Sequence, residues 1–118
     1  MKINHKNFHK RNDSLYFRCS YNKKSKELIG VEELPDPYKV GKFLDLWIYH
    51  WYFIDGKLSL ITKWNNTSKD AKNRKIAFYY FKNEHLIYKD ESTTYIEDIE
   101  LQKKKGEELR RKYSKVLH

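Results

Sequence analysis

The chain has 118 residues, of which 39% are hydrophobic and 35% charged, and its formal net charge is +9. This length fits one compact domain, so we treat residues 1–118 as a single domain. No apolar run has the length of a membrane span or the position of a signal-peptide core, and one cysteine, Cys19, cannot form an intramolecular disulfide. These features predict a protein of a reducing compartment, which we take to be the cytoplasm.

The positive charge comes from 20 lysines and only 5 arginines. It is concentrated in residues 1–30 and 63–90, whose net charges are +6 and +4. Proteins that read phosphates and bases favour arginine, because its planar guanidinium binds both acceptors of a phosphate or a base edge. The charge therefore leaves a nucleic-acid partner possible without establishing one.

The first third of the chain predicts a strand pair. Residues 1–13 are polar and basic, and we expect a basic N-terminal arm or a short first turn of helix. Residues 14–21 alternate well enough for a strand, and residues 27–34 can return as a second strand that Gly30 weakens. The prolines of residues 35–37 end this segment.

The centre of the chain predicts a hairpin. Asp55-Gly56 separates two β-rich runs, residues 44–54 and 57–64, and this dipeptide favours a type I′ turn because both of its positions need a positive φ. The first run is apolar or aromatic on both faces, which is typical of a central strand covered on both sides.

The hairpin pattern recurs farther along the chain. Residues 79–86 repeat the order of residues 51–58, with an aromatic arm, a polar turn and an aliphatic return arm. We therefore expect strands at residues 75–82 and 86–89 that are joined by Asn83-Glu84. Two successive hairpins of this kind indicate a β-meander.

The tail changes to a helical period. Thr94 and Glu97 have the spacing of a capping box, and we expect a helix within residues 97–117, weakened by Gly106 in its middle. A strand at residues 95–101 is the alternative. The predicted fold class is α+β, an antiparallel β-meander sheet of about five or six strands with a C-terminal helix.

The sequence contains no glycine-rich phosphate loop, no GxSxG motif and no CxxC motif. His50 and His85 lie in predicted strands, where either could be an acid–base group of a metal-independent ribonuclease. A lone strand histidine is more often structural, so we expect no catalytic residue. We also expect no metal or other cofactor.

These features favour a non-enzymatic protein-interaction module, and specifically a small inhibitor or immunity-type protein. The alternative is a protein that binds RNA or single-stranded DNA through sheet aromatics and lysines, and a ribonuclease toxin comes third. We expect a protein partner with an acidic contact surface, because the predicted rim is basic. The predicted partner-binding residues are Trp47, Tyr49, Trp51, Tyr79 and Phe81, with Lys63, Arg74 and Lys75 at the rim.

Overall fold

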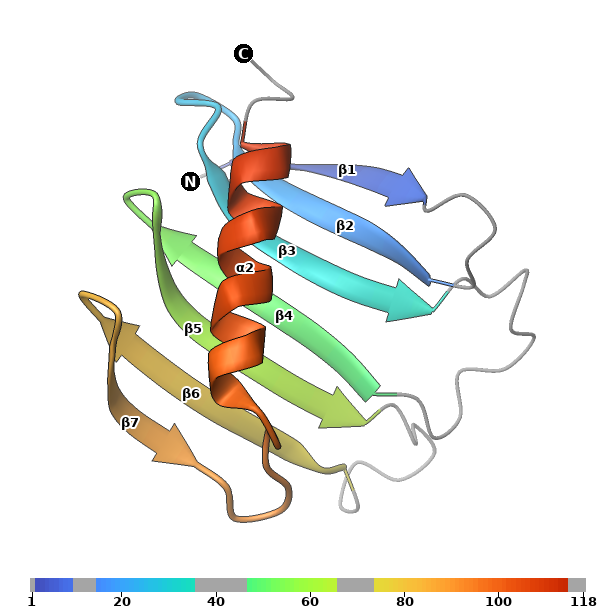
Figure 1. Ribbon diagram of the computed structural model, residues 1–118. Helices are drawn as coiled ribbons and strands as arrows, with labels where there is room; N and C mark the ends of the chain where they lie inside the picture. Colours follow the sequence, from blue (N-terminus) through green and yellow to red (C-terminus); the bar gives the residue numbers. More distant parts are fainter. Residues whose placement is uncertain (1, 10–14, 36–46, 66–73, 115–118) are drawn as a thin grey trace.

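A computed structural model describes residues 2–9, 15–35, 47–65 and 74–114 of the chain. It contains one antiparallel sheet in which the strands lie side by side in chain order, and one long helix (Figure 1). The prediction of an antiparallel meander with a C-terminal helix is confirmed, but the described sheet has seven strands rather than five or six. The elements are β1 (Ile3–His9), β2 (Leu15–Asn22), β3 (Leu28–Pro35), β4 (Trp47–Ile54), β5 (Lys57–Asn65), β6 (Ile76–Lys82), β7 (His85–Asp90) and α2 (Ile99–Tyr113).

The additional strand is β1, where we expected a basic arm or a short first turn of helix. It pairs with β2 along its whole length, and Phe8 stands opposite Phe17. The Phe8 ring also packs on Tyr113 of α2, with 4.6 Å between the ring centroids. A single apolar contact of this kind, together with ladder hydrogen bonds, holds a strand whose own sequence is mostly polar.

The two predicted two-residue turns are confirmed. Asp55 and Gly56 have φ values of 51° and 74°, and Asn83 and Glu84 have values of 50° and 69°. Positive φ at both central positions is the property of a type I′ turn, whose twist matches that of the flanking strands. The similar sequence patterns of residues 51–58 and 79–86 therefore form two hairpins with the same type of turn.

A third hairpin, β2–β3, has a longer turn but follows the same strand-pairing pattern as the other two. In each hairpin the last core-facing aromatic stands opposite a leucine, and the register then shifts by one residue on the return strand. The paired residues are Tyr21 with Leu28, Phe53 with Leu58 and Phe81 with Leu86, and the residues left unpaired are Ile29, Ser59 and Ile87.

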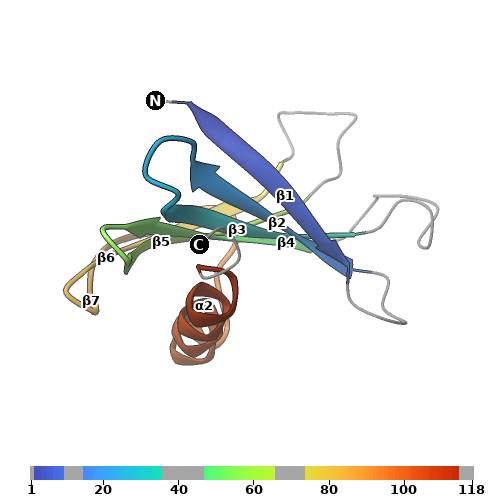
Figure 2. The same cartoon turned by 90° about the horizontal axis from the view of Figure 1, so that it is seen from above.

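Helix α2 crosses one face of the sheet, as the view from above shows (Figure 2). The main core lies between them and includes Val31, Trp51, Ile61 and Leu109. The indole Nε1 of Trp51 donates a hydrogen bond to the Gln102 carbonyl at 3.0 Å. This contact fixes the helix over the middle of the sheet.

The helix begins later than the capping box suggested. Asp98 is its N-cap, and the Asp98 carboxylate accepts a hydrogen bond from the Leu101 N–H at 3.0 Å. The Thr94 capping box and the alternative strand at residues 95–101 are therefore both wrong. Ile96 is instead buried ahead of the helix, where its N–H donates to the Tyr79 hydroxyl at 3.0 Å.

Candidate functional site: the sheet face opposite the helix

The side chains that alternate away from α2 form a second, largely apolar face of the sheet, which we call the distal face. Strand registers align these side chains in rows across β3 to β7. Because neighbouring strands lie about 4.8 Å apart, each row is a continuous ridge of side chains. The first row is Tyr52, Leu60, Tyr80 and Tyr88, the second is Glu32, His50, Thr62 and Phe78, and the third is Ile48, Trp64 and Ile76.

The first row carries the most accessible rings of this face. Tyr80 is 38% exposed and Tyr88 is 60% exposed, and their ring centroids are 5.7 Å apart. Phe78 stacks beside Tyr80 at 6.4 Å. Ile87, in the bulge next to Tyr88, is 62% exposed. Rings and aliphatic groups are thus presented to solvent together on the last two strands.

The second row contains a polar cluster that spans β2 to β4. Glu32 lies between Arg18 Nε, at 3.8 Å, and His50 Nδ1, at 3.9 Å. Burial, together with the neighbouring Arg18 charge, lowers the pKa of His50 to about 4. His50 is therefore neutral at pH 7, and its contact with Glu32 is not an ion pair.

The surroundings of His50 argue for a structural role. Its ring stacks on Tyr52 at 3.7 Å between centroids, and its Nε2 is buried without a hydrogen-bond partner among the described residues. That nitrogen points at Gly30, where a Cβ would lie 2.8 Å away. These contacts fix the ring and keep its Nε2 away from solvent, which is typical of a structural histidine. The other strand histidine, His85, is exposed at the start of β7.

Charged side chains are few among the rows of the distal face. Arg18, Lys57 and Lys82 are its cations along the described strands, and Glu32 and Asp90 are its anions, as strand alternation places them. Arg74 adds a cation at the edge, where its guanidinium lies 5.2 Å from the Trp64 ring centroid. The next residue, Lys75, is exposed.

The structure separates the predicted partner-binding aromatics. Trp51, Tyr79 and Phe81 are buried in the core between α2 and the sheet, so the expectation that they are exposed contacts is wrong. Tyr49 is partly buried and packs against the same core. Sequence reasoning missed the residues on the opposite face, which are Tyr52, Tyr80 and Tyr88. For β4, the sequence did not indicate which face of the strand the helix covers.

Trp47 was predicted as a contact aromatic and Lys63 as a rim residue, and the structure brings the two into contact. The Lys63 ammonium lies 4.4 Å from the Trp47 ring centroid and donates to the Tyr95 carbonyl at 2.9 Å. Lys63 is only 9% exposed, so it is not an accessible rim residue. Trp47 and Tyr95 remain exposed on the helix side, where they shield this ammonium group.

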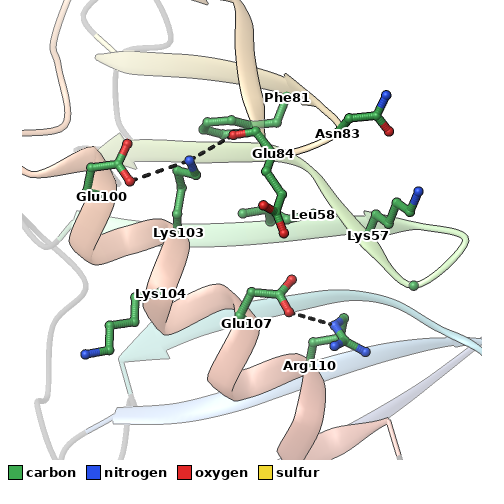
Figure 3. Close-up of a pocket in the computed structure, with 11 residues that line it drawn as sticks. Lys57, Leu58, Phe81, Asn83, Glu84, Glu100, Lys103, Lys104, Glu107 and Arg110 are labelled. Carbon is green, nitrogen blue, oxygen red and sulfur yellow. Dashed lines mark hydrogen bonds and ion pairs between the residues drawn. The ribbon is translucent and has the colours of Figure 1, made fainter.

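A pocket of about 570 Å³ lies between α2 and the turns of the β4–β5 and β6–β7 hairpins (Figure 3). Leu58 and Phe81 contribute its apolar surface. Lys103 bridges it by donating to the Glu84 carbonyl at 2.9 Å, and it lies 3.5 Å from Glu100. The charged lining residues are Lys57, Lys103, Lys104 and Arg110 with Glu84, Glu100 and Glu107, a mixture that favours neither sign of ligand charge.

Within the described ranges, no group of three or more histidine, cysteine, aspartate or glutamate side chains could hold a metal ion. No helix in those ranges is both long and apolar enough to cross a membrane. The chain matches no protein-family model, no curated protein and no solved structure. The distal face, with its exposed aromatic row, is therefore the candidate site that the geometry itself singles out.

Proposed function

We propose that the protein is a non-enzymatic binding module that docks another protein against the distal face of its sheet. One observation carries this proposal, namely the contiguous exposure of Tyr80, Tyr88 and Ile87 on the last two strands. Contiguous exposed apolar surface is typical of interaction sites, and tyrosine is among the residues that dominate interface energy.

The mixture of aliphatic and aromatic groups favours a protein partner over a nucleic acid. Stacking platforms for single strands combine rings with a basic groove that follows the phosphates. Here the described strands give the distal face only a small net positive charge, and Leu60 offers aliphatic surface that bases do not need. Nucleic-acid binding remains the second candidate, because the exposed rings of Tyr80 and Tyr88 could also stack with bases.

The specific form that we propose is a small inhibitor or immunity-type protein that neutralises its partner by occupying it. Arg74 lies at the Trp64 end of the distal face and the next residue, Lys75, is exposed, so an acidic partner surface fits there. Cys19 is a buried free thiol, which fits action in a reducing compartment such as the cytoplasm.

Photo-cross-linking tests the proposal. A photoreactive amino acid replaces Tyr80 in one variant and the exposed helix residue Arg111 in the matched control, and both proteins are irradiated in lysate of the native host with and without nuclease. We expect a discrete protein adduct from position 80 that survives nuclease treatment and is absent from position 111. An adduct that disappears with nuclease would favour the nucleic-acid candidate, and equal labelling from both positions would contradict docking on the distal face.

A further inference from the structure

The return strands of the three hairpins, β3, β5 and β7, differ in whether their outer side is paired. After its bulge, β3 pairs with the next hairpin from Gly30 onward, where Gly30 stands opposite Tyr52. After its bulge, β5 does the same from Leu60 onward, where Leu60 stands opposite Tyr80. The equivalent residue of β7 is Tyr88. In the part of the chain that the structure describes, no strand pairs with the outer side of β7.

The middle of the edge formed by β7 lacks the usual protection of an exposed strand, and charged residues come only at its end, at Lys89 and Asp90. Natural edges are commonly blunted by lysines and other polar or charged groups. The opposite edge, β1, obeys this rule with His5, Lys6 and Asn7 in its middle. The corresponding part of β7 carries Ile87 and Tyr88, which are 62% and 60% exposed. The bulge in β7 is not a barrier in itself, because β3 and β5 carry it and still pair on both sides.

We propose that β7 receives an additional antiparallel strand from the protein partner, with register starting opposite Tyr88. This inference rests on the proposed protein-binding function and specifies how the partner is held. Main-chain hydrogen bonds of strand addition supply affinity, and alternate side chains supply specificity.

The internal hairpins indicate the side chains that such a strand should carry. Tyrosine stands opposite both Gly30 and Leu60 on the distal face, so an aromatic residue fits opposite Tyr88. Two residues farther along, β3 has Glu32 opposite His50, and β7 has Asp90 at that place. A lysine or arginine opposite Asp90 would complement its charge. In the antiparallel direction the inserted segment therefore reads basic–any–aromatic.

A second copy of this chain fits the edge less well. Its free edges in the described sheet are β1 and β7. A second β7 paired at Tyr88 would set Leu86, not a basic residue, opposite Asp90. Strand β1 has His5 and Asn7 among its side chains on the distal face, as strand alternation places them. Neither is an aromatic residue that would continue the row through Tyr80 and Tyr88. The expected occupant is therefore an extended segment of a different protein.

The test uses the whole chain and a capped synthetic peptide, Thr-Val-Lys-Val-Tyr-Val-Thr. A peptide with lysine and tyrosine exchanged is the matched control. We expect saturable binding of the first peptide in amide NMR titrations, with the largest shifts and slowed hydrogen exchange along residues 87–91 and none along β1. Equal binding of the exchanged peptide, shifts centred on β1, or no saturable binding would each overturn the proposal.

The charge pair provides a second measurement. Asp90→Asn keeps the acceptor for the Ser92 N–H, which lies 3.0 Å from the Asp90 carboxylate, but removes the charge. Replacing the peptide lysine by methionine should weaken binding about two- to fivefold with the native chain and leave it unchanged with Asp90→Asn. An unchanged two- to fivefold ratio with Asp90→Asn would contradict the proposed register.

The outcomes also separate this inference from the function on which it rests. If cross-links from position 80 persist but the peptides fail, the partner docks on the face without adding a strand. If the chain self-associates and Tyr88→Lys abolishes this, the occupant of the edge is a second copy, and the proposed partner strand is wrong.

Discussion

Gly106 shows how one residue can be misjudged from sequence. Glycine in a helix interior costs about 1 kcal/mol relative to alanine, so its presence suggests a weak helix. In the structure, a Cβ at position 106 would lie 2.7 Å from Cδ1 of Trp51. The glycine makes room for the largest ring of the core, and its cost in helix propensity is offset by closer packing of α2 on the sheet. No local sequence pattern predicts this contact, because Trp51 lies 55 residues before Gly106 in the chain.

His50 makes stability depend on pH. Its pKa is near 4 in the folded chain because it is buried, against an ordinary value of 6.5 in the unfolded chain. The unfolded chain therefore binds a proton first, and acidification from about pH 6.5 to pH 4 should remove stability on the order of 3 kcal/mol. Arg18 opposes protonation from β2, and Glu32 faces the ring from β3.

The measurement is the free energy of unfolding by urea at several pH values between 7 and 4. His50→Gln should show a smaller loss of stability over this range than the native chain, whatever its stability at pH 7. His85→Gln, at an exposed position, is the control and should keep the native slope. An unchanged slope in His50→Gln would mean that other groups cause the acid sensitivity.

At the scale of elements, the turns are the most predictable feature of this chain. Asp55-Gly56 was identified from residue type, because positive φ restricts the choice of residues strongly, and Asn83-Glu84 was identified from the repeat of the hairpin pattern. The third hairpin was predicted as a strand pair, but its likeness to the other two was missed because its longer turn hides the repeat, in which Tyr21 and Leu28 correspond to Phe53 and Leu58. Strand β1 was missed because pairing with β2 and contact with α2 outweigh its polar composition.

The comparison of the two turns yields a prediction. Glu84 adopts a φ of 69° at the position that Gly56 occupies in the preceding hairpin, where φ is 74°. A side chain at such a φ is strained by roughly 1 kcal/mol, so Glu84→Gly should stabilise the chain by about 0.5–1 kcal/mol. The Lys103 ammonium donates to the Glu84 backbone carbonyl, so the substitution leaves that acceptor in place.

Thermal and urea unfolding of Glu84→Gly would check this expectation. Gly56→Ala is the reverse change and should cost about 1 kcal/mol, because a Cβ there meets no atom within 4 Å and the loss comes from the backbone alone. If both substitutions destabilise the chain, the side chain of Glu84 contributes more than its strain costs.

At the scale of the whole molecule, the sequence could not indicate which side of the sheet is the core. Strand β4 is apolar or aromatic on both faces, and the alternation that normally separates core from surface is absent. Trp51 and Phe53 lie under α2, while Tyr52 lies on the distal face. The candidate interaction surface on this fold could therefore be identified only once the position of the helix was known.

The central claim is that rings on the distal face bind the partner and rings under the helix hold the fold. Tyr79 and Tyr80 are neighbours in the chain on opposite faces, 3% and 38% exposed. They provide a matched pair, because the same substitution at each position removes the same side chain.

The most direct test measures the Tm and the partner dissociation rate for Tyr79→Ala and Tyr80→Ala, using the protein captured by cross-linking from position 80. Tyr80→Ala should leave the Tm nearly unchanged and weaken the complex by about 2 kcal/mol, mainly through faster dissociation. Tyr79→Ala should destabilise the fold by roughly 3–5 kcal/mol. Native-like binding by a well-folded Tyr80→Ala protein would contradict the account.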